Sequence, residues 1–368
     1  MYSFSFRCRP LIEVQMHGVW NALLSTAVSA VVLLLVLPSF ARRVGLLDYP
    51  TGRKRHERAV PLVGGLAIVL SVTLGSFLDP AALSTHWVLL IGLLVICTLG
   101  VADDLVDLQY RVKLIGQIAV SLLIVVVGGN AVTHVGYLFF SETGYGLGPF
   151  SAVFSVVAIV GLMNAYNMID GHDGLAASCG VTTLVSMFVV LLLIDKDPPD
   201  SLIILLLIPL SIFLIFNLDS LVGRQRQVFL GDAGSLILGL AIAYLLIRHS
   251  GVSSSLIKVS AAPWLVGLPL LDMIAVMTRR ILNCRSPFGA DRIHFHHIMM
   301  DYGLGKGRVL LLALALQLVF SGIGIFGVLR NWPDGMLFWG LFVTLLAYLW
   351  LMKWLYSNGE RSQARSAS

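Results

Sequence analysis

Several short stretches of this 368-residue chain carry residue types that suit phosphate and divalent cations. The stretch DDLVD places Asp103, Asp104 and Asp107 within little more than one helical turn, and Arg111 and Lys113 follow it. Three carboxylates this close repel one another unless a cation or a shared proton relieves the repulsion. The two bases are good donors to phosphate. The combination favours metal-assisted phosphate chemistry over a plain solvated helix end.

The stretch NAYNMIDGHDG has the most specific local pattern in the chain. Its polar side chains recur every third residue, at Asn164, Asn167, Asp170 and Asp173. Gly171 and Gly174 allow the backbone to turn tightly between two apolar helices. Asn and Asp are also ordinary turn residues, but four on one period exceed what a turn needs. We therefore interpret this stretch as a binding segment.

The stretch GDAGS, residues 231–235, opens another apolar segment. Unpaired backbone amides at a helix start favour an anion, and Asp232 can serve as the N-cap. Simple capping is the alternative to a functional role. If Asp232 is instead a ligand, carboxylate and amide oxygens together with phosphate suit Mg²⁺, or Mn²⁺, and not zinc.

The stretch DRIHFHH gathers Arg292, His294, His296 and His297. Closely spaced histidines occur in zinc sites, but no cysteine pair or H-E-x-x-H pattern accompanies them here. Phosphate binding by the arginine and the histidines is the interpretation that we prefer. The basic loop RKRHER, residues 53–58, is compatible with a purely topogenic role.

The elements that must position these residues are membrane helices. Hydrophobic residues make up 57% of the chain, charged residues only 12%, and the mean hydropathy is +0.88. Apolar segments of spanning length recur along the whole chain. They predict an all-α, polytopic membrane protein with about eleven spans, at 18–40, 61–79, 86–102, 114–129, 148–168, 174–194, 201–218, 233–247, 259–278, 309–329 and 335–355. We expect one membrane domain over 1–357 and a disordered tail over 358–368.

Charge and cysteine usage exclude other classes. The net charge of +5 comes from bases in short loops between apolar segments, so it indicates membrane orientation and not nucleic-acid binding. The four cysteines stand alone and form no C-x-x-C pair, so neither a disulfide framework nor a zinc site is indicated.

The distribution of basic residues predicts the orientation. If the helices alternate, 19 of the 25 Lys and Arg residues fall on the side of the odd-numbered loops and the C-terminus. The positive-inside rule makes that side cytoplasmic and the N-terminus periplasmic. All four polar stretches lie on the same side. The prediction is a membrane protein whose site faces the cytoplasm.

The motifs, taken in order, resemble those of the polyprenyl-phosphate N-acetylhexosamine-1-phosphate transferase family, and most closely those of its bacterial undecaprenyl-phosphate N-acetylglucosamine-1-phosphate transferases. The likeness covers residues 42–308. Six stretches carry it: PLVGG (61–65), DDLVD, NAYNMIDGHDG, VFLGDAGS, PLLDM (269–273) and SPFGADRIHFHH.

The resemblance implies transfer of N-acetylglucosamine-1-phosphate from UDP-N-acetylglucosamine to undecaprenyl phosphate, with release of UMP. The lipid diphosphate-sugar would start O-antigen or a related polysaccharide. Partners would be the UDP-N-acetylhexosamine, the lipid phosphate and the bilayer, and a homodimer is an assembly that the sequence allows.

The resemblance also assigns roles. Asp232 and Asn167 would hold Mg²⁺, and Asp103 and Asp104 would position or deprotonate the acceptor. Substrate contacts would come from Lys113, Asn164, Asp170, Asp173, which would contact the uracil, and from Arg292, His294, His296 and His297.

Two features of the sequence depart from the family pattern, and three alternative functions remain open. His172 stands where the family more often has an aliphatic residue, and HFHH differs from the HHH run of the related muramoyl-pentapeptide transferases. The alternatives are another UDP-N-acetylhexosamine, an intramembrane prenyltransferase with two Asp-rich motifs, and a secondary transporter with its site near the midplane.

Overall fold

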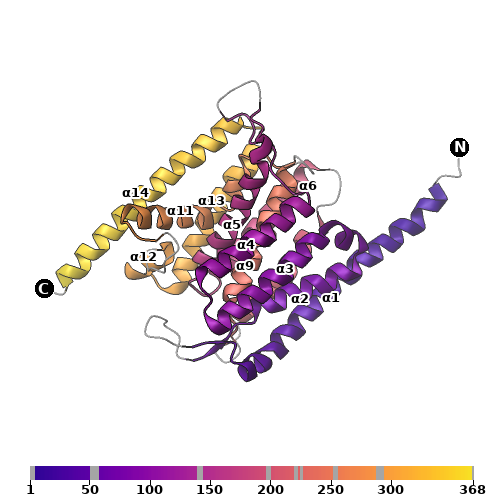
Figure 1. Cartoon of the computed structure of the whole chain (residues 1–368), viewed down its shortest axis with the longest axis horizontal. Coiled ribbons are helices and arrows are strands. Elements are labelled where there is room, and N and C mark those ends of the chain that lie inside the picture. Colours follow the sequence, from indigo (N-terminus) through magenta and orange to yellow (C-terminus); the bar gives the residue numbers. More distant parts are fainter. Residues whose placement is uncertain are drawn as a thin grey trace. The chain divides into compact units, whose positions relative to one another are not determined.

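The computed structural model describes residues 5–49, 58–138, 144–195, 200–218, 223, 227–251, 256–286 and 294–366, with the side chains of 5–17 and 359–366 excepted. Helices dominate it, as predicted (Figure 1). The chain forms two compact units, each assembled from two separate stretches of sequence. Unit 1 contains 1–107 and 198–237, and unit 2 contains 108–197 and 238–368. The prediction of a single membrane domain is not tested by this division.

Unit 1 is built on α1 (Ser5–Val44), α2 (Gly64–Leu78), α3 (Pro80–Val106) and α7 (Ser201–Asn217). Helix α2 packs against the other three. A short antiparallel pair, β1 (Leu47–Asp48) and β2 (Val60–Pro61), joins α1 to α2, and Leu62 then forms a parallel bridge with Phe229. The basic loop at 53–58 lies outside the described residues except for Arg58.

Unit 2 contains α4 (Tyr110–Leu122), which continues as a π-helical turn, η1 (Leu123–Val127), and α5 (Ser151–Ile169), preceded by the 3-10 turn η2 (Gly148–Phe150). Then follow α6 (Leu175–Ile194), α10 (Ala262–Leu265), α11 (Gly267–Leu282), α12 (Phe295–Asp301), α13 (Lys306–Leu329) and α14 (Asp334–Ser366). Helix α5 packs on α4 and α11, and α13 packs on α6 and α10. Helix α9 (Gly231–Ser250) belongs to unit 1 up to Ile237 and to unit 2 thereafter.

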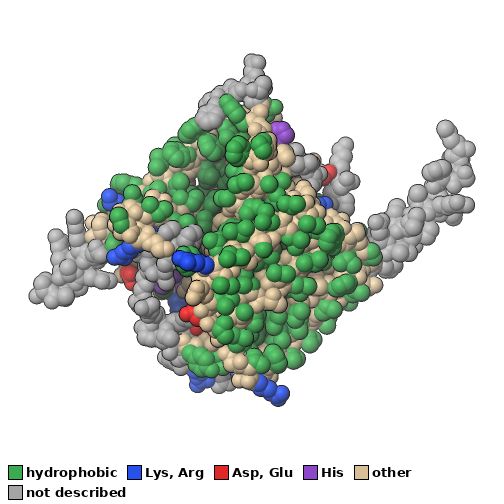
Figure 2. Space-filling view, in the orientation of Figure 1, with side chains coloured by type: hydrophobic (Ala, Val, Ile, Leu, Met, Phe, Trp, Pro, Cys, Tyr) green, Lys and Arg blue, Asp and Glu red, His purple; other side chains and the backbone are tan. Residues whose placement is uncertain are grey.

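Eight helices in the described part of the chain are long and apolar enough to cross a membrane. Two of the other predicted spans form the shorter apolar helices α2 and α7. Hydrophobic side chains cover much of the visible surface of the helices (Figure 2), and many large ones are exposed, such as Leu24, Trp87 and Phe154. This surface suits a lipid environment. The chain is a polytopic helical protein, while the count of eleven and the orientation stay predictions.

The predicted segment at 259–278 is not one continuous helix, because Pro269 interrupts it. It divides into α10 and α11, with Val266 between them. Pro269 has no N–H to donate to the carbonyl of Leu265, four residues earlier, and its ring clashes with a carbonyl at that position. The break therefore falls where the sequence removes a helical hydrogen bond.

Other helices of unit 2 satisfy the backbone groups that this break exposes. The Leu265 carbonyl accepts hydrogen bonds from Gln317 Nε2 at 2.6 Å and from the Thr183 hydroxyl at 2.8 Å. The N–H of Leu268 donates to Gln317 Oε1 at 3.0 Å. Gln317 is fully buried, so one side chain of α13 replaces both missing partners. Polar groups buried among apolar helices must be paired within the protein.

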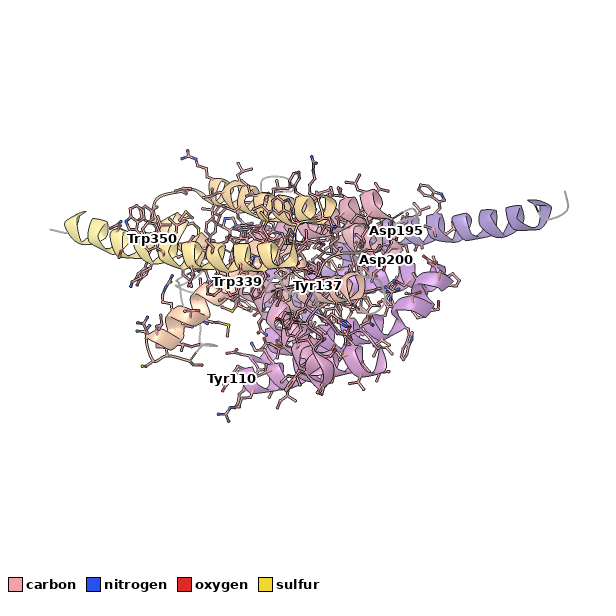
Figure 3. The ribbon with its side chains drawn as sticks, turned by 90° about the horizontal axis from the view of Figure 1, so that it is seen from above. Tyr110, Tyr137, Asp195, Asp200, Trp339 and Trp350 are labelled. Atoms are coloured by element: carbon pink, nitrogen blue, oxygen red, sulfur yellow. The ribbon has the colours of Figure 1, made fainter. Side chains whose placement is uncertain are left out.

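Asp334, at the start of α14, fixes a second irregular region of unit 2. Its carboxylate accepts the N–H of Tyr137 at 3.0 Å and the hydroxyl of Ser260 at 2.7 Å. The indole N–H of Trp339 donates to the Leu138 carbonyl at 3.2 Å. Figure 3 labels Tyr137 and Trp339, whose aromatic side chains are both exposed. Aromatic rings of this kind are enriched at membrane interfaces.

Helix α14 extends to Ser366 and so includes most of the segment 358–368, whose disorder stays a prediction. The residues after Asn358 include Glu360, Arg361, Gln363 and Ala364, which are good helix formers, and no proline stands among them. Local helix propensity therefore accounts for the continuation of α14 beyond Asn358.

We expect Gln317→Leu to destabilise the protein, because it leaves the Leu265 carbonyl and the Leu268 N–H with fewer partners. The cost of a buried polar group without its partner is about 1–3 kcal/mol. Thermal unfolding in detergent, followed by circular dichroism, should show a lower midpoint. Leu318→Val is the matched control, since Leu318 is the exposed neighbour on α13. Equal midpoints for the two variants would contradict this account of the helix break.

Candidate functional site

The first polar cluster lies in unit 1, where the end of α3 meets the start of α9. Asp104, in the last turn of α3, accepts the N–H of Asp232 on Oδ1 at 3.1 Å and approaches the N–H of Ala233 with Oδ2 at 3.5 Å. Capping by Asp232 was the alternative to a functional role, and the structure contradicts it, because Asp232 lies within the first turn of α9 and Asp104 supplies the acceptor. The first free amides of α9 are thus paired with a carboxylate, as their positive dipole favours.

Close backbone packing brings these two helix ends together. A side chain on Gly65 of α2 would collide with Gly234, and one on Gly100 of α3 would collide with Ala233. Gly231 has a φ of 74° and stands directly beside the Asp104 carboxylate. A positive φ and this proximity both favour glycine. The glycines of PLVGG and GDAGS therefore let α2 and α3 approach the first turn of α9.

The acidic side chains of this cluster differ in exposure. Asp103 is buried and Asp104 is half-buried, whereas Asp107 is exposed and ends α3 with a left-handed φ of 52°. The carboxylates of Asp232 and Asp103 both repel that of Asp104. Asp107 therefore terminates the helix, while Asp103, Asp104 and Asp232 form the concentrated negative charge.

The chemistry of this donor set fits a magnesium ion that keeps water and phosphate ligands. No three Asp, Glu, His or Cys side chains of the described residues converge as a complete metal site. Mg²⁺ is usually held by only one or two carboxylates, with water and substrate phosphate completing its shell. Asp232, alone or with one of its acidic neighbours, would supply these one or two carboxylates. Asn167, the other predicted ligand, is half-buried in the last turns of α5 in unit 2, and its ligation stays a prediction.

The second polar cluster lies in unit 2 and centres on the turn between α5 and α6. Helix α5 ends at Ile169, Asp170 follows as its C-cap, and Gly174 adopts a φ of 76° immediately before α6. The predicted role of Gly174 in a tight turn is confirmed. Gly171 has a different role, because a side chain there would collide with the His296 ring. It therefore allows the histidine segment to pack on this turn.

Asp173 in this turn forms an ion pair that the sequence did not indicate. Lys306 Nζ, at the start of α13, lies 2.9 Å from Asp173 Oδ2. The lysine side chain is half exposed, so the pair contributes little to stability. Its position matters more, because it places a cation at the turn. The only hint in the sequence was a lone lysine soon after the histidine stretch.

The three histidines of HFHH gather at the start of α12. The rings of His294 and His296 are stacked with centroids 5.7 Å apart, and those of His296 and His297 are 4.2 Å apart. His296 is 1% exposed, and neither of its ring nitrogens has a hydrogen-bond partner. Buried polar atoms are nearly always paired, so the unpaired nitrogens of His296 indicate a ligand. Arg292 lies outside the described residues.

Burial makes His296, and also His172 in the neighbouring turn, a poor base. Burial lowers the pKa of His296 well below its usual value, and repulsion from His297, His294 and His172 lowers it further. Burial also lowers the pKa of His172, whose Nδ1 lies 2.9 Å from the Asp173 carbonyl and whose Nε2 has no partner. In the ligand-free protein, both rings are therefore neutral near pH 7.

The remaining predicted residues have separate positions in unit 2. Asn164 donates to Gln117 Oε1 at 2.7 Å and so joins α5 to α4, which gives it a packing role. Lys113 is half-buried in the first turns of α4. Substrate contacts by Asn164, Lys113 and Asp170 stay predictions. Asp272 of PLLDM has no predicted role, yet its side chain is buried and forms a hydrogen bond with His294. The sequence signal for a role of Asp272 was its position as a lone carboxylate within an apolar segment.

Comparison with known proteins identifies the class. Residues 86–250 match the glycosyl transferase family 4. The chain is 33% identical to an undecaprenyl-phosphate alpha-N-acetylglucosaminyl 1-phosphate transferase of Escherichia coli O157:H7, over 84% of this chain and 83% of that protein. Proteins of the same name from Yersinia pestis and Haemophilus influenzae are 31% and 28% identical, over 80% and 93% of this chain and 80% and 97% of their own lengths.

The protein therefore belongs to glycosyl transferase family 4. Within that family, the resemblance to the polyprenyl-phosphate N-acetylhexosamine-1-phosphate transferases is confirmed.

We expect the free energy of unfolding of the ligand-free protein to fall as the pH drops from 7 to 5.5. Because burial lowers the pKa of His296 and His172, the unfolded chain takes up protons below about pH 6.5 while the folded protein does not. Each histidine contributes at most about 1.4 kcal/mol per pH unit. Thermal midpoints measured across this range test the sign.

His296→Gln is the informative variant for this pH dependence, because it removes one of the two titrating rings. Its midpoint should fall less between pH 7 and 5.5 than that of the wild type. Carboxylates titrate equally in both proteins, so their contribution cancels in the comparison. Parallel curves for variant and wild type would show that His296 has no depressed pKa.

Proposed function

We propose that this protein transfers N-acetylglucosamine-1-phosphate from UDP-N-acetylglucosamine to undecaprenyl phosphate, releasing UMP. The relation that carries the proposal is the similarity over most of the chain to proteins whose name describes this transfer. The two polar clusters supply residues of the kinds that the reaction needs. The lipid diphosphate-sugar would start O-antigen or a related envelope polysaccharide.

The reaction joins two anions, so the protein must reduce their repulsion. An oxygen of the lipid phosphate attacks the phosphorus that carries the sugar, and the bond from that phosphorus to UMP breaks. The sugar C1–O bond survives, so the anomeric configuration is kept. A lipid phosphate is already largely ionised near pH 7, so a general base is not essential. Positioning and charge stabilisation are the main catalytic contributions.

Asp232 would hold a magnesium ion, with the acidic side chains of Asp103 and Asp104 beside it. The ion, when bound, would offset the negative charge of the transferring phosphates. Asp104 has a further task within unit 1, because its hydrogen bond to the Asp232 N–H sets the start of α9. Loss of Asp104 would therefore move Asp232 as well as remove a charge.

The histidine cluster would bind phosphate oxygens of the nucleotide-sugar, and Asp173 would contact the uracil. The unpaired nitrogens of His296 and His172 support this assignment, since a ligand would supply the partners that the protein does not. Lys306 would add positive charge on the same turn. The excess of basic residues on the side of these motifs supports a cytoplasm-facing site in the bacterial inner membrane.

The direct test incubates the purified protein with radiolabelled UDP-N-acetylglucosamine, undecaprenyl phosphate and Mg²⁺. Extraction should recover label in the lipid fraction, with one UMP released for each sugar transferred. UDP-N-acetylgalactosamine, offered in parallel, tests the choice of sugar. Release of UMP without a labelled lipid would indicate hydrolysis and refute the transfer.

Asp232→Asn should reduce turnover by roughly a hundredfold or more while the thermal midpoint changes little. A neutral amide holds a hard divalent cation less firmly than a carboxylate does, and charge stabilisation is a large catalytic term. EDTA should stop the wild-type reaction, and added Mg²⁺ or Mn²⁺ should restore it. Asp107→Asn is the matched control, since Asp107 is the exposed acid at the end of α3. Near-wild-type turnover in Asp232→Asn would end the metal assignment.

Asp173→Ala should raise the KM for the UDP-sugar and leave the KM for undecaprenyl phosphate nearly unchanged. Loss of one hydrogen-bonding group facing a ligand costs about 1–3 kcal/mol, which is roughly a 5- to 150-fold change. Steady-state kinetics with each substrate varied separately measure both values. Asp195→Asn, at the opposite end of α6, is the control. An equal rise in both KM values would exclude a role in nucleotide binding.

A further inference from the structure

Three helices of unit 2 meet at the buried carboxylate of Asp272. Asp272 lies on α11 and is 1% exposed. Its Oδ2 is 3.0 Å from Nδ1 of His294, while its Oδ1 accepts the N–H of Phe295 and the hydroxyl of Tyr348, each at 3.0 Å. A buried carboxylate requires such donors. Asp272 has one from the residue before α12, one from α12 itself and one from α14.

This arrangement determines which nitrogen of His294 is left for a ligand. A carboxylate oxygen only accepts, so Nδ1 of His294 must carry the hydrogen that it shares with Asp272. Nε2 is then the nitrogen left for a ligand. It accepts a hydrogen bond when the ring is neutral and donates one when the ring is protonated. The pairing also fixes the ring plane, and the His296 ring stacks on it at an interplanar angle of 12°.

Helix α14 also contacts α11 and α12 at two points that do not involve Asp272 or His294. The hydroxyl of Tyr302, at the end of α12, donates to the Leu355 carbonyl at 2.7 Å. The guanidinium of Arg279 on α11 lies over the Tyr356 ring, 5.7 Å from its centroid. Together with Tyr348, these contacts tie α11 and α12 to the last helix of the chain. The residues that make these contacts all lie after the segment 86–250 that matches the family.

We propose that Asp272 and Tyr348 are positioning residues for His294, holding its ring so that Nε2, in the imidazolium form of the ring, donates to a phosphate oxygen of the nucleotide-sugar. Tyr348 acts through Asp272, because its hydroxyl occupies Oδ1 and leaves Oδ2 to the histidine. The last helix thereby contributes to donor binding without touching the donor. This inference rests on the proposed role of the histidines in binding the donor.

Asp272→Asn tests the tautomer directly and nearly preserves the side-chain volume. An asparagine can keep its oxygen toward the Phe295 N–H and the Tyr348 hydroxyl only by turning its NH₂ group toward His294. That group donates, so Nδ1 must become an acceptor and the hydrogen must move to Nε2. ¹⁵N NMR of histidine-labelled protein in lipid bilayers distinguishes the two forms, and His294→Gln assigns the signals.

The wild type should show His294 protonated at Nδ1, and Asp272→Asn should show the change to Nε2. The kcat/KM for UDP-N-acetylglucosamine should fall roughly 10- to 100-fold in Asp272→Asn, as is typical when a partner that orients a functional histidine is lost. The KM for undecaprenyl phosphate should stay within roughly twofold. Tyr348→Phe should keep the Nδ1 hydrogen and lose less activity, because Oδ2 still holds His294.

A double-mutant cycle separates positioning from a general structural role. If Asp272 acts through His294, adding Asp272→Asn or Tyr348→Phe to His294→Ala should cause no further loss of kcat/KM. Tyr302→Phe is the matched control, because it removes a hydrogen bond between α12 and α14 without touching Asp272. It should keep both the tautomer and, within roughly twofold, the activity.

Independent, multiplicative losses in the cycle, or an unchanged tautomer in Asp272→Asn, would overturn the positioning role. The NMR measurement needs no turnover, so it tests that role even if the purified wild type forms no lipid product. In that case the proposed function fails, while an Nδ1-protonated His294 that changes tautomer in Asp272→Asn still supports positioning by Asp272. A wild-type His294 that carries its hydrogen on Nε2 alone would refute the positioning role of Asp272.

Discussion

Polar groups buried among apolar helices must find their partners inside the protein, and much of this structure follows from that requirement. A bilayer core offers no water to a backbone amide, carbonyl or carboxylate. The break between α10 and α11 shows the consequence most directly. Pro269 removes the partner of the Leu265 carbonyl, and a single glutamine on α13 then bonds to both sides of the break. The packing of three helices is thereby set by two backbone groups.

The same requirement produces the two polar clusters, although by different means. In unit 1, glycines let the backbones of α2, α3 and α9 come close enough for Asp104 to reach the free amides of α9. In unit 2, Asp272 collects three donors and orients His294, while His296 keeps two nitrogens without partners. One cluster is therefore acidic and internally bonded, and the other is rich in histidine and incompletely bonded.

This contrast corresponds to a division of chemical roles under the proposed function. Carboxylates suit a divalent cation, whereas histidines and a lysine suit the oxygens of a phosphate. The low pKa of His296 and His172 follows from burial, which for His172 outweighs the nearby Asp173 carboxylate, and an anionic ligand would supply further negative charge. The ring nitrogens of His296 and His172 thus lack partners at the place where the substrate would provide them. This is expected for an enzyme that stabilises a charged transition state.

The sequence by itself determined the helical membrane character, most of the helix positions and the identity of the reactive stretches. Apolar length and the spacing of Asp, Asn, Gly and His are local properties, so a single chain reveals them. Spacing also indicated the turn at Gly174, whose positive φ only glycine adopts easily. Spacing did not predict which side chains form hydrogen bonds or ion pairs with one another, because those partners come from segments that are distant along the chain.

Tertiary structure decided those partners. Asp104 caps α9 in place of Asp232 because packing of Gly100 against Ala233 brings the two helix ends together. Lys306 pairs with Asp173 across more than a hundred residues, and Tyr348 reaches Asp272 from the last helix. Such contacts depend on where helices cross, which hydropathy does not encode. The sequence therefore specified which residues could do chemistry, and only the packing of the helices specified which neighbours orient them.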